Sequence, residues 1–490
     1  KTPSGSMTSL TVWMRTSGFC ASLLSLHRRC VDCDENRKPR VFVVGSGVVG
    51  VTSAYALARR GVPVTILDAA PTGVASGCSK VNAGSICSAP WNGTITQPSA
   101  VRSFIKGWWD GDPVYRFNKK EMFLDPYFWR WAIPYWFAVM WWPWRATTAE
   151  FYNQNLGSFL EANREIAALE SAGCLRPGRV VVALDGMPVD TSEAPKPDGA
   201  MQRGRHLSRA EAVQLEPCLT ALADRISSAT HYPDTPSMHC GDFTQDVADV
   251  LKRKYAVEIQ SGVSVSGLAK SDGHITGIVC SDGREISVAK DEAVLICCGA
   301  ESPRLLEPLG VRTPIYPFIG YSITVKVPKE FAEHAPRSMV VNKTKNIWTT
   351  KFTEDRVRFT SIVEFGGGHD TTDATNLDFR GAASGLAALR EMITECFPGL
   401  VPLLDRPDTL YLCGARPQSA DDVPLVGKAP RHSNLYVNAG HGQHGWSMAA
   451  GTGEIAARTI LGLGLEEWPL AGCLDPARFD AFQAPWKRWR

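Results

Sequence analysis

Three glycines with the spacing of a phosphate-binding turn lie near the start of the chain, in Gly45-Ser-Gly47-Val-Val-Gly50. The first glycine allows a tight turn, the second lets a pyrophosphate approach the backbone, and the third lets a helix pack closely on a strand. Asp68 follows Gly50 by 18 residues, where a carboxylate can accept hydrogen bonds from both ribose hydroxyls and would repel a 2′-phosphate. The pattern therefore predicts a dinucleotide site that disfavours NADP, and the turn alone leaves FAD and NAD open.

The elements around this turn are those that a dinucleotide site needs. Residues 41–44 and 64–67 are apolar runs typical of buried parallel strands, and 51–60 between them has the composition of a helix. The end of the chain repeats the arrangement, with a strand over 435–438, a glycine-rich turn over 440–445 and a helix to about 461. Within 313–365, apolar and polar residues alternate, which predicts an antiparallel sheet. We expect an α/β fold in which a discontinuous Rossmann-like domain is interrupted by an inserted α+β domain built on an antiparallel sheet.

Further motifs follow the order of one known family. They are Ser79-Lys-Val-Asn82-Ala-Gly84 with Ala89-Pro-Trp91, Phe243-Thr-Gln245, Ile315-Tyr-Pro317 with Gly320-Tyr-Ser-Ile-Thr324, Gly414-Ala-Arg416-Pro417, and a terminal block from Pro424 to Gly453. Over about residues 40–465 the chain resembles the small subunit of the bacterial D-amino-acid dehydrogenases, within the D-amino-acid oxidase and glycine oxidase superfamily of FAD enzymes. The resemblance implies an FAD-binding domain over 39–91, 236–304 and 406–466, and a substrate domain over 92–235 and 305–405.

The resemblance also implies a reaction. Family members oxidise the Cα–N bond of an amino acid by hydride transfer to flavin N5, and the resulting imino acid hydrolyses to a keto acid and ammonia. The expected partners are a small amino acid, D-amino acids first, and an electron acceptor such as a quinone, an electron-transfer protein or a dye. Two alternatives remain: an oxidase or dehydrogenase of secondary amines and glycine (proline, sarcosine), and a mitochondrial assembly factor that keeps the FAD fold without turnover.

Three residues are expected to act on the substrate. Arg416 resembles the family's carboxylate-binding arginine, and a guanidinium can hold a carboxylate through two parallel hydrogen bonds. Tyr321 is a candidate partner for the same carboxylate by analogy. His444 stands where the family usually has leucine, so it is expected to alter substrate choice or electron acceptor, and retention of Arg416 and Tyr321 favours an enzyme over an assembly factor.

The expected cofactor is FAD, and no metal site is expected. The helix that begins near Gly445 would direct its positive amino end at the flavin N1–C2=O edge. His441 and His444 either tune the protonation of the amine or serve as turn residues. The expected FAD-binding residues are Gly45, Gly47, Val48, Val49, Gly50, Asp68, Ser79, Asn82, Ala83, Gly84, Val265, Cys298, Gly299, Gly414, Gly440, His441, Gly442, Gln443, His444 and Gly445.

Composition excludes several other classes of protein. The chain has 490 residues, 44% hydrophobic and 21% charged, which suits a globular protein of two or three domains and excludes a disordered one. The balance of 52 basic and 50 acidic residues argues against nucleic acid as the main partner. Fourteen scattered cysteines favour a reduced compartment over a disulfide framework.

Residues 1–38 are predicted to lie outside the folded domains. Lys1–Ser6 precede the first methionine and are interpreted as a tag remnant. Residues 7–31 contain no acid and carry three arginines, which is the composition of a mitochondrial transit peptide, so a mitochondrial location is expected. A tail without function is the alternative.

Eight of the fifteen tryptophans lie between Trp108 and Trp144. The most apolar run there, 128–144, is interrupted by Arg130, Pro134 and Pro143, so it does not predict a membrane-spanning helix. Because tryptophan favours sites with one apolar and one wet side, segment 108–144 is predicted to make peripheral contact with a membrane. An aromatic core of the substrate domain is the alternative.

Overall fold

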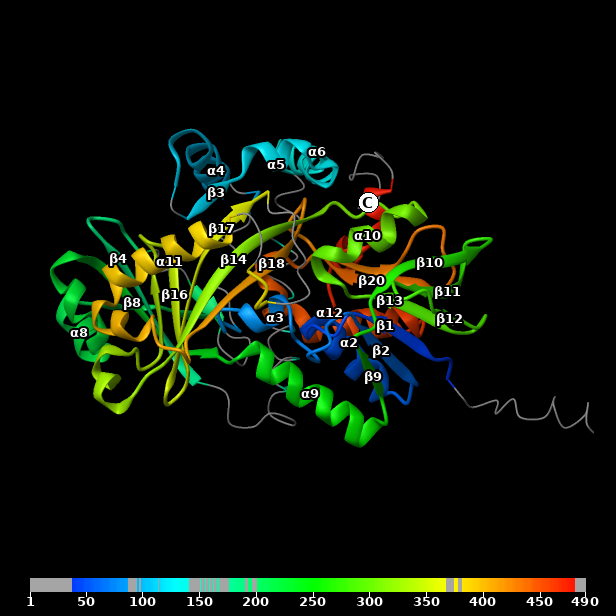
Figure 1. Ribbon diagram of the computed structural model, residues 1–490, viewed down its shortest axis with the longest axis horizontal. Coiled ribbons are helices and arrows are strands. Elements are labelled where there is room, and N and C mark those ends of the chain that lie inside the picture. The colour runs from blue at the N-terminus through cyan, green and yellow to red at the C-terminus, as the bar shows by residue number, and fades with distance from the viewer. Residues whose placement is uncertain are drawn as a thin grey trace, which may run out of the picture. The chain divides into compact units, whose positions relative to one another are not determined.

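A computed structural model describes residues 38–86, 95–96, 98–112, 114–140, 176–189, 193–195, 201–366, 374–377 and 381–480, with isolated positions between 150 and 166. The chain divides into two compact units, Lys1–Pro39 and Arg40–Arg490. Every described helix and strand belongs to the second unit (Figure 1). The predicted tag remnant and transit segment, save residue 38, lie outside the described residues.

A six-stranded sheet carries the glycine-rich turn. Its order is β19 (Leu425–Lys428), β20 (Leu435–Ala439), β13 (Ala293–Ile296), β1 (Val41–Val44), β2 (Val64–Asp68) and β9 (Glu258–Ser261). All neighbouring pairs are parallel except β19 with β20. Strands β1, β13 and β20 are buried along their whole length, as in a parallel sheet that is covered on both faces.

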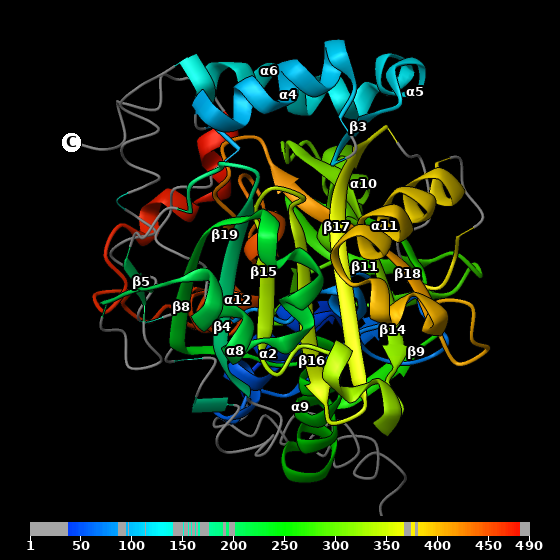
Figure 2. The same cartoon turned by 90° about the vertical axis from the view of Figure 1, so that its left-hand side faces the viewer.

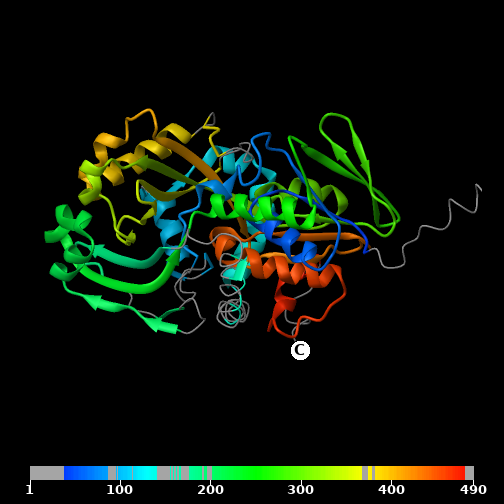
Figure 3. The same ribbon diagram turned by 90° about the horizontal axis from the view of Figure 1, so that it is seen from below.

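Three helices cover one face of this sheet, and a small sheet lies on the other (Figures 1 and 3). The helices are α2 (Val48–Ala58), α9 (Cys240–Tyr255) and α12 (Gly445–Ile460). The opposite face packs against β10 (Val265–Ser271), β11 (His274–Cys280), β12 (Glu285–Ser287) and α10 (Ser302–Leu306). The predicted Rossmann-like arrangement is confirmed.

A nine-stranded, mainly antiparallel sheet forms the second part of the fold. Its order is β18 (Leu410–Ser419), β14 (Ile315–Lys326), β17 (Arg356–Phe365), β16 (Ile347–Thr353), β15 (Met339–Asn342), β4 (Arg176–Leu184), β8 (Ile226–Ser237) and β7 (Arg205–Leu207), and β3 (Tyr115–Phe117) pairs with β17. Helices α8 (Arg209–Leu215) and α11 (Ala382–Cys396) cover one face with an apolar core. A separate two-stranded ribbon consists of β5 (Glu193–Pro195) and β6 (Met201–Arg203).

One predicted domain boundary differs from the structure. Segment 406–466 was expected to belong wholly to the FAD-binding domain, but β18 at its start pairs with β14 over ten residues and is a strand of the nine-stranded sheet. The chain therefore crosses from one sheet to the other between β18 and β19.

Three consecutive helices lie as a layer beside β3, β14 and β17 (Figures 1 and 2). They are α4 (Pro98–Asp110), α5 (Lys119–Leu124) and α6 (Pro126–Met140). The inner face of α6 is aromatic: the ring of Trp131 lies 5.3 Å from that of Phe318 and 6.0 Å from that of Tyr316. No helix in the described part of the chain has both the length and the apolar character needed to cross a membrane.

Candidate active site

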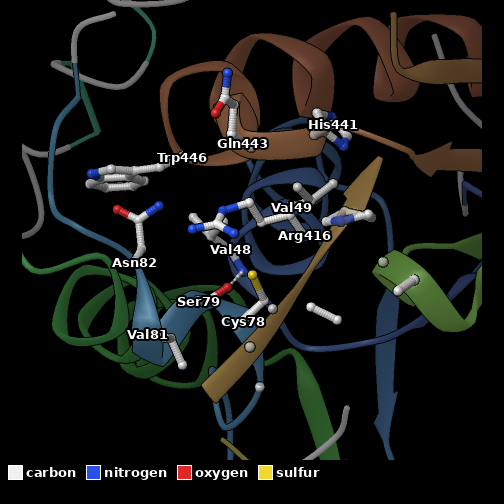
Figure 4. A pocket seen from close by; sticks show the side chains of 18 of the residues that line it. Val48, Val49, Cys78, Ser79, Val81, Asn82, Arg416, His441, Gln443 and Trp446 are labelled. Carbon is white, nitrogen blue, oxygen red and sulfur yellow. Dashed lines mark hydrogen bonds between the residues drawn. The ribbon is translucent and has the colours of Figure 1, made fainter. Parts of the chain in front are cut away.

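A cavity of about 1150 Å³ is lined from both sheets. Its walls come from segments that are far apart in the sequence, among them the β1–α2 turn, the short helix α3 (Cys78–Val81), the loop after β13, the middle of β18 and the turn before α12. Figure 4 shows side chains from α2, α3, β18 and that last turn around the same space. The glycine motif at one end of the chain and the terminal motif at the other thus meet in one site.

The glycine-rich turn has the geometry that the sequence predicts. Gly45 has a φ of 105°, and a methyl group on Gly50 would overlap the backbone oxygen of Gly45, so Gly50 permits close packing of α2 on β1. The carboxylate of Asp68 accepts hydrogen bonds from the backbone N–H groups of Ser46 (2.6 Å) and Ala70 (2.8 Å). These bonds fix Asp68 at the end of β2, where it lines the cavity.

The amino end of α2 also faces the cavity. The first N–H of this helix, on Val48, donates to Ser79 Oγ at 3.0 Å, and Gly47 lies against the same oxygen. Unpaired N–H groups and the helix dipole make such an end a site for anions. Three features of this region fit the dinucleotide that the sequence predicts. The glycines leave no space for a side chain, Asp68 lies where it could bind a ribose, and the amino end of α2 could face the phosphates.

The second helix end at the cavity belongs to α12. The turn Gly442–His444 precedes it, and Gln443, His444 and Trp446 line the space. Gly442 has a φ of 55°, and a methyl group there would overlap the amide of Gln418. Gln418 Nε2 in turn donates to Asp422 Oδ1 at 2.7 Å. The buried pair of Gln418 and Asp422 therefore packs against the turn at Gly442.

Two histidines of this turn are neutral. Burial lowers the pKa of both His441 and His444 to about 3. His441 Nε2 lies 3.0 Å from Thr452 Oγ1 inside α12, an arrangement that fixes the start of the helix and supports its interpretation as a turn residue. His444 lines the cavity as a neutral imidazole, so it can offer a hydrogen bond there but no charge.

Arg416 lies over the backbone of Gly320, in the register that pairs Gly414 of β18 with Gly320 of β14. Its Nη1 donates to the backbone oxygen of Ile362 at 3.0 Å. No carboxylate of the described residues lies within ion-pair distance of this guanidinium. Burial lowers the pKa of Arg416, yet a guanidinium stays protonated in proteins, so a ligand carboxylate would supply the missing counter-charge.

The described acidic residues that line the cavity are confined to one side of it, whereas cations line both sides, with Arg304 on the six-stranded side, where it pairs with Glu301. On the nine-stranded side the described lining residues include Arg179, Lys343 and Arg416 and no acid. The acidic lining residues that the structure describes are Asp68 and Glu301, both from the six-stranded side. This asymmetry favours an anionic ligand next to the nine-stranded sheet.

The expectation that Tyr321 shares the substrate carboxylate with Arg416 is wrong. Neighbouring residues of a strand point to opposite faces, and Gly320 already occupies the face toward Arg416. Tyr321 is fully buried in the core beneath α11, where its hydroxyl donates to Glu364 at 3.1 Å and its ring lies against Gly385. Its role is to pack and anchor the sheet.

Three glycines expected at the cofactor lie outside the cavity lining. Gly50 packs on Gly45, Gly84 (φ 87°) lies against the ring of Phe352, and Gly440 (φ 83°) lies against Ile315. These glycines shape the site from outside. The other expected cofactor residues line the cavity: Gly45, Gly47, Val48, Val49, Asp68, Ser79, Asn82, Ala83, Val265, Cys298, Gly299, Gly414, His441, Gly442, Gln443, His444 and Gly445.

Sequence reasoning missed several lining residues, among them Cys78, Tyr115, Gly320, Ile362 and Trp446. Gly320 and Trp446 lie within recognised motifs, but no role followed from their positions. Only the pairing register of β14 with β18 places Gly320 under Arg416, and one sequence does not reveal that register.

Comparison with known proteins agrees with this geometry. Residues 40–459 match the family described as FAD dependent oxidoreductase. A curated protein named D-amino acid dehydrogenase from Allorhizobium ampelinum is 29% identical over 449 residues, 86% of this chain and 95% of that protein. Another of the same name from Xanthobacter autotrophicus is 30% identical over 440 residues, with the same coverage of 86% and 95%.

Solved structures share the fold. Glycine oxidase from Geobacillus kaustophilus has a TM-score of 0.59 at 19% identity and covers 90% of this chain and 99% of its own. Iminodiacetate oxidase from Chelativorans sp. BNC1 has a TM-score of 0.57 at 21% identity and covers 87% and 96%. At such identities the likeness concerns the fold alone.

Proposed function

The chain belongs to the family of FAD-dependent oxidoreductases, and from this premise we propose that it oxidises D-amino acids to keto acids and ammonia. Its cofactor is FAD, and its relatives are amino-acid dehydrogenases. The observation that carries the proposal is Arg416, a cation directed into the cavity on the side that contains no described acid. The names of the two curated relatives support D-amino acids as the substrate class.

The chain's residues would hold the cofactor at three places. Asp68 would accept hydrogen bonds from the ribose hydroxyls, and the amino end of α2 would face the pyrophosphate. The amino end of α12 would place positive potential beside the flavin ring, where it stabilises negative charge. FAD, when bound, supplies the acceptor atom for the hydride and carries the electron pair to the next acceptor.

Arg416 performs the orienting step on the substrate. Two N–H groups of its guanidinium match the two oxygens of a carboxylate, and the bond to Ile362 restricts the side chain. A substrate held in this way presents one Cα–H to the cofactor, and orientation of this kind replaces much of the need for a strong base. The substrate loses a hydride from Cα and a proton from nitrogen, and water then converts the imine into the keto acid and ammonia.

The neutral state of His441 and His444 is compatible with this chemistry. A cationic imidazole beside the amine would oppose positive charge as the Cα–N bond gains double-bond character. Because burial keeps both rings uncharged at pH 7, they impose no such repulsion.

An anaerobic experiment tests the proposal. Purified protein that releases FAD on heating is mixed with D-amino acids, their L-enantiomers, sarcosine, glycine and L-proline, and flavin absorbance is followed. Bleaching by D-amino acids in preference to the others is expected. Bleaching by sarcosine or L-proline alone would favour a secondary-amine enzyme, and no bleaching by any compound would favour an assembly factor. Oxygen consumption against dye reduction then separates an oxidase from a dehydrogenase.

Mitochondrial import remains a proposal from the composition of residues 7–31. The curated relatives named above are bacterial and lend this location no support. A fluorescent fusion with and without these residues tests it: identical distribution of the two fusions would remove the proposal.

A further inference from the structure

The cavity continues along the nine-stranded sheet past Arg416, as far as the tight turn that joins β15 to β16. This turn consists of residues 343–346, and we call it the β15–β16 turn. Its first residue, Lys343, and its last residue, Asn346, both line the cavity. A cation and an amide therefore stand at a part of the cavity to which the proposed function assigns no role.

The pairing of the strands relates this turn to Arg416. Continued by two residues, the register of β15, β16 and β17 places Lys343 and Asn346 in one line with Ile362, to whose backbone oxygen Arg416 donates. The backbone oxygen of Asn346 accepts a hydrogen bond from Ser361 Oγ at 2.8 Å, which agrees with this register. Neighbouring strands lie about 4.8 Å apart, so two strand spacings, roughly 10 Å, separate Lys343 from Ile362.

The β15–β16 turn is held in place by contacts outside the cavity. Thr344 Oγ1 accepts a hydrogen bond from the backbone N–H of Leu184 in β4 at 2.8 Å. The ammonium of Lys345 lies 2.7 Å from a carboxylate oxygen of Glu395 in α11, the helix that covers the other face of the sheet. The two lysines of the turn thus differ, because Lys343 lines the cavity and Lys345 does not.

Apolar side chains line the cavity beside the turn. Val181, Val341 and Trp348 belong to one small apolar cluster and also line the cavity. Walls of this kind suit the methylene groups of a substrate side chain, and Lys343 beyond them suits a negative charge at its end. Arg179 lines the same side of the cavity, so a positively charged side chain would face two cations there.

We propose that Lys343 and Asn346 form a second carboxylate subsite, so that the preferred substrates are amino acids with an acidic side chain. The inference rests on the proposed function, in which Arg416 holds the α-carboxylate. In an extended glutamate, four carbon–carbon bonds separate the two carboxylate carbons, which is roughly 5 Å. Each carboxylate lies about 2.8 Å from the cation that binds it, so these lengths together match the roughly 10 Å of two strand spacings. The flexible stem of lysine adapts to a side chain one carbon shorter, as in aspartate.

Binding of dicarboxylates tests the subsite without catalysis. Glutarate carries both carboxylates of glutamate and no amine, and glutaramate has the same shape with one carboxylate replaced by an amide. Because Lys343 is exposed, water screens part of its attraction, and calorimetric titration of the FAD-loaded protein should show glutarate binding about fivefold more tightly than glutaramate. Lys343→Met should remove this difference. Lys345→Met, in the same turn but at the residue that pairs with Glu395, should retain it.

Flavin reduction extends the test to substrates. D-glutamate should reduce the flavin of the wild type about fivefold more efficiently than D-glutamine, and D-lysine should be the poorest of the three. The ratio for D-glutamate over D-glutamine should fall to about one in Lys343→Met and stay at the wild-type value in Lys345→Met. FAD content and melting temperature serve as fold controls for both variants.

The outcomes separate this subsite from the proposed function. Equal affinity of the wild type for glutarate and glutaramate overturns the subsite, as does a preference for glutarate that survives in Lys343→Met. Equal reduction by D-glutamate and D-glutamine overturns it as well and leaves the oxidation of D-amino acids standing. A preference for glutarate that requires Lys343, without reduction by any D-amino acid, supports the subsite and removes the proposed substrate class.

Discussion

Arg416 Nη1 donates a hydrogen bond to the backbone oxygen of Ile362, and Ile362 has a φ of 71°. Among the described residues other than glycine with a positive φ, Ile362 is the only one branched at Cβ. This backbone conformation costs on the order of 1–3 kcal/mol and persists only where the surroundings impose it. The pairing of β14 with β17 shifts register between Ile319 and Tyr321, at the same place. The strained backbone thus lies where the guanidinium of Arg416 is held.

Gly320→Ala should displace Arg416, because the added methyl group would overlap its guanidinium. We expect the rate of flavin reduction by substrate to fall at least tenfold and the half-saturating concentration to rise, with FAD content unchanged. Stopped-flow reduction measures both quantities. Gly267→Ala is the matched control, since a methyl group there meets no atom within 4 Å. A wild-type reduction rate in Gly320→Ala would show that the position of Arg416 is irrelevant.

Arg416→Ala removes a charge-assisted pair worth about 1.5–3 kcal/mol. Flavin reduction should therefore lose roughly one to two orders of magnitude in efficiency. Arg416→Lys keeps the charge without the planar fork, so its efficiency should lie between those of the wild type and Arg416→Ala. If Arg416→Ala loses its FAD, the residue supports the fold; if its kinetics are unchanged, it lies outside the substrate site.

Asp68→Asn should weaken FAD binding. The charged carboxylate accepts from Ser46 and Ala70 and is placed to accept from the ribose, and hydrogen bonds to charged groups contribute about 1.5–3 kcal/mol. Titration of the apoprotein with FAD should show a dissociation constant raised about tenfold or more. Asp291→Asn, at an exposed acid, should bind FAD as the wild type does. Equal affinity in both variants would remove Asp68 from the cofactor site.

His444→Leu should change how the free energy of unfolding depends on pH below about pH 6.5. The pKa of His444 is about 3 in the folded protein against about 6.5 in an unfolded chain, so the unfolded state binds more protons between these values. The free energy of unfolding contributed by His444 is complete above about pH 6.5 and is lost as the pH falls toward 3. Between pH 7 and pH 4 the melting temperature of His444→Leu should fall less than that of the wild type. Parallel curves would mean that the imidazole is charged or solvated in the fold.

Asp422→Asn should change how stability depends on pH between about pH 4 and pH 8. Burial raises the pKa of Asp422 to about 8, so the folded state keeps a proton that the unfolded chain releases near pH 4. The associated stability is complete below about pH 4 and is lost as the pH rises toward 8. Asparagine mimics the protonated carboxyl without titrating. The melting temperature of Asp422→Asn minus that of the wild type should therefore be larger at pH 8 than at pH 5. A difference that does not vary with pH contradicts this expectation.

The structural features that the sequence predicts best are those that depend on residues close together in the chain. The turn at Gly45–Gly50, the strand before it and the carboxylate of Asp68 form one local unit, and the structure has each as expected. Tyr321 was misplaced because a shift of one residue along a strand reverses the face to which a side chain points. The membership of β18 in the nine-stranded sheet depends on its pairing with a strand almost 100 residues earlier, which no local pattern reveals.

The tryptophan-rich segment shows another limit. The number of aromatic residues predicted either an aromatic core or an exposed aromatic surface. In the described part of the segment both occur on different sides of the helices, because Trp131 is buried whereas Trp109 and Trp136 are exposed. The choice between faces depends on how α6 is rotated against β14, which is decided by packing with Tyr316 and Phe318.

The order of strands in the six-stranded sheet determines when the protein can finish folding during its synthesis. The central strand β1 needs β13 beside it, β13 needs β20, and β20 follows β1 by about 400 residues. At the usual rate of about 5–20 residues per second, the first strand must wait roughly 20–80 s for its sheet. During that interval the apolar side chains of Val41–Val44 have no completed core, so the sheet stays unfinished until the last turn of the cofactor site has left the ribosome.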